Sequence, residues 1–75
     1  MALYENISGN SNITGYNIGE DFISVMFNNG SVYDYTYESA GQENVDQMKI
    51  LARSGSGLNS FIYNNVKDLY EWYGL

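Results

Sequence analysis

The sequence predicts an α+β domain, in which a three-stranded antiparallel β-meander is followed by two helices packed on one sheet face. Two observations carry this prediction. Apolar residues alternate with strand periodicity over residues 13–37, and they recur with helical periodicity over residues 42–73. A chain of 75 residues is long enough for one small core. We therefore expect a single two-layer βββαα domain over residues 13–75, preceded by an arm over residues 1–12.

The arm is polar and becomes rich in Gly, Ser and Asn toward its end. Its only substantial apolar anchors are Leu3, Tyr4 and Ile7. Such a segment can fray, add a strand to the sheet or reach onto a neighbouring subunit. The sequence leaves these three outcomes open.

Three runs of residues have the composition of strands, at 13–18, 22–27 and 31–37. Gly19-Glu20-Asp21 separates the first two as a turn, and Asn28-Asn29-Gly30 separates the second from the third. The second and third runs therefore form a hairpin.

The register of this hairpin depends on the length of its loop. If Asn28-Asn29-Gly30 is a three-residue loop with its glycine in the left-handed region, Val25 faces Tyr33 and Ile23 faces Tyr35. A two-residue loop would place the members of each pair on opposite sheet faces, so we expect the longer loop. The second, mixed face then carries Phe22, Ser24, Met26, Val32, Asp34 and Thr36.

The first helix is expected over residues 42–53. Ser39 and Gln42 have the spacing of a capping box, which makes Ser39 the expected N-cap. Acids near the start of the helix and Arg53 at its end suit the helix dipole. The inward stripe consists of Val45, Met48, Leu51 and Ala52.

The second helix is expected to run from about Leu58 toward Tyr73, after a break at residues 54–57. We expect Gly55 to close the first helix in the left-handed conformation and Ser56 to cap the second. The apolar face of the second helix comprises Leu58, Ile62, Val66, Leu69 and Tyr73. The stripe beside it comprises Asn59, Tyr63 and Lys67.

Composition excludes several classes of function. The chain has nine acids, three bases and a net charge of −6, so coating of duplex DNA is not expected. It has no cysteine and no histidine, so thiolate and imidazole chemistry are excluded. No long apolar run or charged leader is present, and we expect a cytoplasmic protein of a bacterial cell, possibly one infected by phage, with no membrane contact.

The order of several short motifs resembles the KTSC family, a small domain found at the C-terminus of some lysyl-tRNA synthetases and as stand-alone bacterial and viral proteins. The matching features over residues 13–73 are Tyr16-Asn17, Ile23-x-Val25-x-Phe27, Asn29-Gly30, Tyr33-x-Tyr35, Ser56-Gly57-x-Asn59 and Ile62. The family usually has a Val-Pro step before its first helix, whereas this chain has no proline. The resemblance implies a fold and a link to nucleic acid.

A first set of candidate residues suits a nucleotide. The helix-connecting loop combines a cation, backbone amides and a helix start, which together can hold a phosphate. Exposed tyrosines can stack on bases, although the expected register favours a core position for them. This tentative ligand set is Arg53, Ser54, Gly55, Ser56, Gly57, Asn59, Lys67, Tyr33 and Tyr35.

A second set suits a protein partner. All three cations lie after residue 47, while seven of the nine acids lie before it, so the charge is polarised along the chain. Carboxylates can steer a basic partner, and exposed aromatic residues can anchor it. This tentative interface set is Asp34, Glu38, Tyr63, Tyr70 and Trp72.

We expect neither catalysis nor a bound metal or other cofactor. Glu20, Asp21, Asp34 and Glu38 form an acidic group without the spacing of an EF-hand, which favours a solvated surface over a cation site. The serines have no histidine to activate them.

Two functions remain open. The first is a non-catalytic module that binds a small signalling nucleotide or short RNA. The alternative is an acidic interaction module, such as a phage inhibitor of a host nucleic-acid-binding or defence protein. Because the expected core is thin and the sheet has open edges, we expect a homo-oligomer in either case.

Overall fold

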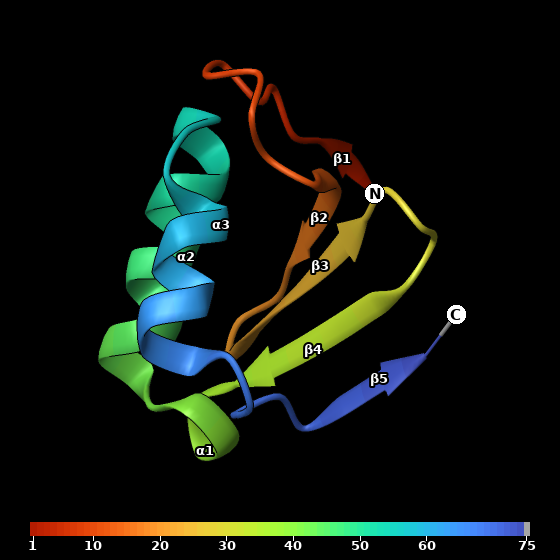
Figure 1. The fold of residues 1–75 in the computed structure, drawn as a ribbon. Coiled ribbons are helices and arrows are strands. Elements are labelled where there is room, and N and C mark those ends of the chain that lie inside the picture. Colours follow the sequence, from red (N-terminus) through yellow and green to blue (C-terminus); the bar gives the residue numbers. More distant parts are fainter. Residues whose placement is uncertain (75) are drawn as a thin grey trace.

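The computed structural model describes residues 1–74 as one antiparallel sheet with helices on one of its faces (Figure 1). The strand order is β1-β2-β3-β4-β5. The strands are β1 (Ala2–Leu3), β2 (Ile13–Ile18), β3 (Phe22–Phe27), β4 (Val32–Thr36) and β5 (Trp72–Gly74). The helices are α1 (Tyr37–Ala40), α2 (Gln42–Ser54), α3 (Leu58–Phe61) and the π-helix η1 (Ile62–Val66). The α+β class is confirmed, but the expectation of three strands is wrong, because the sheet has five.

The first extra strand, β1, comes from the N-terminal arm, which pairs within its own chain. Ala2 lies opposite Tyr16 and Leu3 lies opposite Gly15. The next residue, Tyr4, is buried in the core, and its hydroxyl accepts a hydrogen bond from the Leu58 amide at 3.3 Å. Of the three outcomes that the sequence left open, the structure shows the added strand.

The central hairpin has the predicted register. Val25 lies opposite Tyr33 and Ile23 lies opposite Tyr35. Gly30 has a φ of 88°, and its amide donates to the Phe27 carbonyl at 2.9 Å, which closes the three-residue loop. The apolar pairs can therefore face the helices together.

The second extra strand, β5, replaces the end of the predicted second helix. Helical structure stops at Val66 rather than near Tyr73, and the amide of Glu71 instead donates to the Asp34 carbonyl at 2.7 Å. Tyr73 lies opposite Tyr33 and stacks on its ring, with the ring centroids 5.1 Å apart. Strand pairing and aromatic stacking therefore decide the structure of a segment whose apolar spacing also suited a helix.

Two predicted helix caps are wrong. Ser39 was expected to cap the helix over residues 42–53, but Gly41 precedes that helix, α2, and Ser39 lies at the third position of α1, where it forms a capping box with Thr36. Gly57, with a φ of 85°, precedes α3 where Ser56 was expected to cap it. The role of Gly55 is confirmed, because it ends α2 in the left-handed conformation.

The core lies between the sheet and the helices. α2 contributes Val45, Met48 and Ala52, and Leu51 is half-buried. The core as a whole comprises Tyr4, Ile13, Ile23, Val25, Tyr35, Ala40, Val45, Met48, Ala52, Leu58, Ile62 and Val66. None of the helices in residues 1–74 is both long enough and apolar enough to span a bilayer.

Lys49 is buried although it is not a member of the predicted inward stripe of this helix. Its ammonium group donates to the Glu20 carbonyl at 2.9 Å and to the Tyr37 hydroxyl at 3.3 Å, and lies 3.8 Å from an Asp46 carboxylate oxygen. These contacts join the β2–β3 turn to α1 and α2. The Lys49 ammonium group therefore stabilises the fold and is not available to bind a ligand.

Candidate functional site: a tyrosine pocket beside the π-helix

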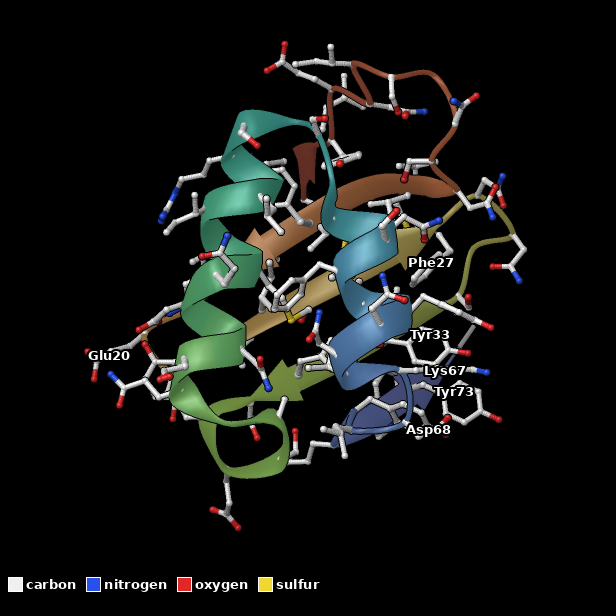
Figure 2. All side chains as sticks on the ribbon, turned by 60° about the vertical axis from the view of Figure 1, so that its left-hand side comes forward. Glu20, Phe27, Tyr33, Lys67, Asp68 and Tyr73 are labelled. Atoms are coloured by element: carbon white, nitrogen blue, oxygen red, sulfur yellow. The ribbon has the colours of Figure 1, made fainter. Side chains whose placement is uncertain are left out.

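A pocket of about 390 Å³ opens between the β3–β4 hairpin and the α3–η1 segment. Figure 2 shows Phe27, Tyr33, Tyr73, Lys67 and Asp68 gathered on this side of the molecule, with Glu20 at the opposite end. The pocket is lined by Asn12, Phe27, Asn28, Asn29, Ser31, Tyr33, Tyr35, Asn59, Ile62, Tyr63, Lys67, Asp68 and Tyr70. Its size falls within the range of small-molecule sites.

One wall of the pocket is an aromatic cluster built on Tyr33. The ring of Tyr73 stacks on the ring of Tyr33, and the rings of Phe27 and Tyr70 meet it edge to face at 5.5 and 5.1 Å. Tyr70 also contacts Tyr73 edge to face. Since each ring is held by its neighbours, this wall is preorganised.

The floor of the pocket contains the hydroxyl of Tyr35. The residue is only 1% exposed, and no group in residues 1–74 hydrogen-bonds this hydroxyl. Every fully buried side-chain polar atom in the described residues has a partner, so the unpaired Tyr35 hydroxyl must open onto the pocket that the residue lines. Burial raises the pKa of Tyr35 well above its ordinary value of 10.0, and nearby Tyr33, Tyr70 and Asp68 add to this rise. The floor therefore offers a neutral hydroxyl.

Polar groups of two kinds complete the pocket. The side chain of Asn59 makes no hydrogen bond within residues 1–74 and is available to a ligand. Asn29 is already engaged, because its side-chain oxygen accepts from both the amide and the hydroxyl of Ser31. At the rim, the Lys67 ammonium lies over the Tyr63 ring, 5.0 Å from its centroid. The next residue, Asp68, also lines the pocket.

The structure divides the predicted ligand set. Tyr33, Tyr35, Asn59 and Lys67 line the pocket, whereas Arg53 lies exposed on the last turn of α2 and is not among the lining residues. Residues 54–57 are also not part of the pocket lining. The expected single site of loop and tyrosines is thus not formed.

The loop itself is less open to an anion than its sequence suggested. The Gly55 amide donates back to the Leu51 and Ala52 carbonyls, and the Leu58 amide is taken by Tyr4. Moreover, the side chain of Glu5 packs against Gly55, which places a carboxylate beside the proposed phosphate position. A phosphate bound at this loop would therefore be repelled by the Glu5 carboxylate.

The predicted interface set is also divided, between the two sides of the sheet. Tyr63 and Tyr70 line the tyrosine pocket. Asp34 and Glu38 line a separate hollow, and Trp72 lies opposite Asp34 in the strand register. Within residues 1–74, no group of three or more acidic side chains is arranged to hold a metal ion, so the acidic residues near Glu20 form no candidate cation site.

Sequence reasoning did not assign seven of the lining residues to a site, and one of them, Ile62, was considered only for the apolar face of the second helix. Four of them, Asn28, Asn29, Phe27 and Ser31, belong to the hairpin or its loop, which we considered only for its register and for the family resemblance. The signal was present as two consecutive asparagines next to an aromatic residue, with a serine after the glycine that follows them. Asn12 and Asp68 reach the pocket only through the tertiary arrangement.

Comparisons with family models, with curated proteins and with solved structures found no match to this chain. The resemblance to the KTSC family therefore stays a prediction. The site has to be interpreted from its own chemistry, which is an aromatic wall, a neutral hydroxyl at the floor, the unbonded side-chain amide of Asn59 and one cation at the rim.

Proposed function

We propose that the protein is a non-catalytic binding module that holds a nucleotide-bearing ligand, such as a small nucleotide or the end of a short RNA, in the tyrosine pocket. The observation that carries this proposal is the Tyr35 hydroxyl, which belongs to a buried residue, opens onto the pocket and has no partner in the described residues. Because this hydroxyl opens onto the pocket and makes no hydrogen bond within residues 1–74, a ligand can pair with it without breaking a bond of the fold. A planar base fits the aromatic surroundings because every base has a face that can stack.

The charges at the rim limit the number of phosphates. Lys67 supplies one cation, and the adjacent Asp68 would repel further negative charge. This arrangement favours a ligand with a single phosphate near the mouth over a long polyanion. It also agrees with the net charge of −6, which opposes tight binding of an extended nucleic acid.

The same groups argue for binding rather than catalysis. The raised pKa of Tyr35 keeps its hydroxyl neutral near pH 7, so it donates or accepts a hydrogen bond but does not act as a base. The chain supplies no histidine or cysteine to replace it in that role.

Isothermal titration calorimetry with the four ribonucleosides, their 5′-monophosphates and a short single-stranded RNA tests the proposal. We expect at least one of these probes to bind, and Tyr35→Phe to weaken it about tenfold by loss of one buried hydrogen bond. Lys67→Gln should weaken only phosphate-bearing probes and leave the free nucleosides unaffected.

Arg53→Gln is the matched control, since it removes one cation outside the pocket and should leave the affinity unchanged. The proposal is overturned if no probe binds, or if Tyr35→Phe binds as tightly as the wild type. Equal losses for Arg53→Gln and Lys67→Gln would show general electrostatic attraction instead of a site at the pocket.

A further inference from the structure

No helix or strand of residues 1–74 covers the sheet face opposite the helices (Figure 1). Side chains alternate between the two faces of a strand, and Val25 and Tyr33 point into the core. Their neighbours Met26 and Val32, which lie opposite each other, therefore point to the uncovered face. This face is independent of the tyrosine pocket.

An apolar strip crosses this face from one sheet edge to the other. Met1, Leu3 and Trp72 are 61%, 80% and 56% exposed. Gly15 brings Met1 and Met26 together, because a Cβ at this glycine would lie 3.6 Å from an atom of each. At the other edge, the Trp72 ring lies over Gly74, which pairs with Val32. The strip consists of Met1, Leu3, Met26, Val32 and Trp72.

Four carboxylates lie along one side of the strip. Asp21, Asp34, Glu38 and Glu71 line a hollow of about 410 Å³ together with Phe22 and Thr36. Two of them are held in place, because Ser24 donates to Asp34 at 2.6 Å and Thr36 donates to Glu71 at 2.9 Å. The only ion pair within residues 1–74 joins Lys49 to Asp46, so none of the four carboxylates is neutralised by the chain itself.

Charge decides which kind of partner suits this face. Nucleic acids and anionic membranes carry the same sign as the four carboxylates, so both are repelled. Two copies packed through this face would bring both sets of carboxylates together without a counter-charge. The three basic side chains of the chain do not supply it either, since Lys49 is buried in its network, Lys67 lies over Tyr63, and Arg53 lies on α2, on the opposite side of the sheet.

We propose that the uncovered sheet face docks a cationic segment of another protein, with apolar side chains on the strip and lysine or arginine side chains at the four carboxylates. The exposed apolar area supplies the attraction, and the unneutralised carboxylates select for positive charge. This inference does not depend on the nucleotide proposal, because the two surfaces share no residue.

Trp72 is the only tryptophan of the chain, so its fluorescence reports directly on this face. The probe is a synthetic peptide that combines arginine and leucine and contains no aromatic residue. We expect a saturable change in Trp72 emission on titration, with affinity that falls as salt rises. The same peptide with glutamine in place of arginine should not bind.

Matched double variants separate a specific face from overall charge. Asp34→Asn with Glu38→Gln should weaken the peptide about tenfold, since each exposed ion pair contributes a few-fold. Asp34→Asn keeps an oxygen that can accept from Ser24. Glu5→Gln with Glu43→Gln removes the same charge from exposed positions that do not line the hollow, and should leave affinity close to wild type.

The proposal is overturned by equal losses in the two double variants, by equal binding of the glutamine peptide, or by an unchanged Trp72 signal at saturating peptide. A change in Trp72 emission with protein concentration alone would assign the face to a second copy and overturn it as well. Circular dichroism on each variant verifies that the sheet is intact.

Discussion

Removing the hydroxyl group from Tyr4 and from Tyr35 separately should change stability in very different ways. Both rings are buried and both substitutions to phenylalanine keep the ring. The Tyr4 hydroxyl, however, accepts from the Leu58 amide at 3.3 Å, whereas the Tyr35 hydroxyl has no partner within residues 1–74. The pair therefore compares a bonded hydroxyl with an unbonded one.

Tyr4→Phe leaves the Leu58 amide without a partner in a buried place. The cost of such a group is about 1–3 kcal/mol, and the long 3.3 Å separation favours the lower end of that range. In a domain of this size each kcal/mol lowers the melting temperature by about 4–8 °C. We therefore expect Tyr4→Phe to lower it by about 5–10 °C, and Tyr35→Phe to change the free energy of unfolding by less than about 0.5 kcal/mol.

Urea and thermal unfolding, both followed by circular dichroism, measure these differences. Tyr63→Phe is the control, since Tyr63 is 69% exposed and should be neutral. If Tyr35→Phe destabilises the protein as much as Tyr4→Phe does, the Tyr35 hydroxyl is bonded in the folded state and the pocket argument fails. If Tyr4→Phe has no effect, the arm is not anchored through this bond.

Three further predictions concern stability. Gly30→Ala should lower the free energy of unfolding by about 1 kcal/mol, because only backbone strain opposes this substitution. Gly55→Ala should lower it further, since the new Cβ would lie 2.7 Å from a Glu5 carbon. Lys49→Met keeps the alkyl chain but leaves the Glu20 carbonyl unpaired, so urea unfolding should show a loss of about 1–3 kcal/mol; no loss would show that the network is dispensable. The raised folded-state pKa of Tyr35 means that the unfolded chain loses this proton first, so stability should fall as pH rises above about 10. Tyr35→Phe should reduce that fall in unfolding free energies measured between pH 8 and 11, and an unchanged profile would contradict the assignment.

The expectation of a homo-oligomer stays a prediction, although the structure changes its physical basis. The arm that was a candidate for reaching a neighbour pairs with β2 of its own chain. The edge strands are Ala2–Leu3 and Trp72–Gly74, and such short edges offer little length for pairing between chains. Light scattering coupled to size-exclusion chromatography measures the state directly.

Local sequence was enough to determine the central hairpin and most of α2. The pairing of Val25 with Tyr33 follows from alternation and loop length, because any one-residue slip would expose the whole apolar face. The end of α2 at Gly55 likewise follows from the need for a residue that accepts a positive φ. These features depend on residues close together in the chain.

Only the tertiary structure decided the two outer strands and the site. β1 has two residues, too few to show any periodicity, and it exists because β2 offers an unpaired edge and Tyr4 a buried anchor. The apolar spacing of Leu69 and Tyr73 suited a helix equally well, and pairing with β4 decided for a strand. The pocket depends on tertiary structure in the same way. Tyr33 stacks on Tyr73, which is 40 residues away in the chain, and Tyr35 and Asn59 line one pocket only because the helices pack on the sheet. Contacts of this kind compete with local preference through burial and stacking, which a linear sequence pattern does not reveal.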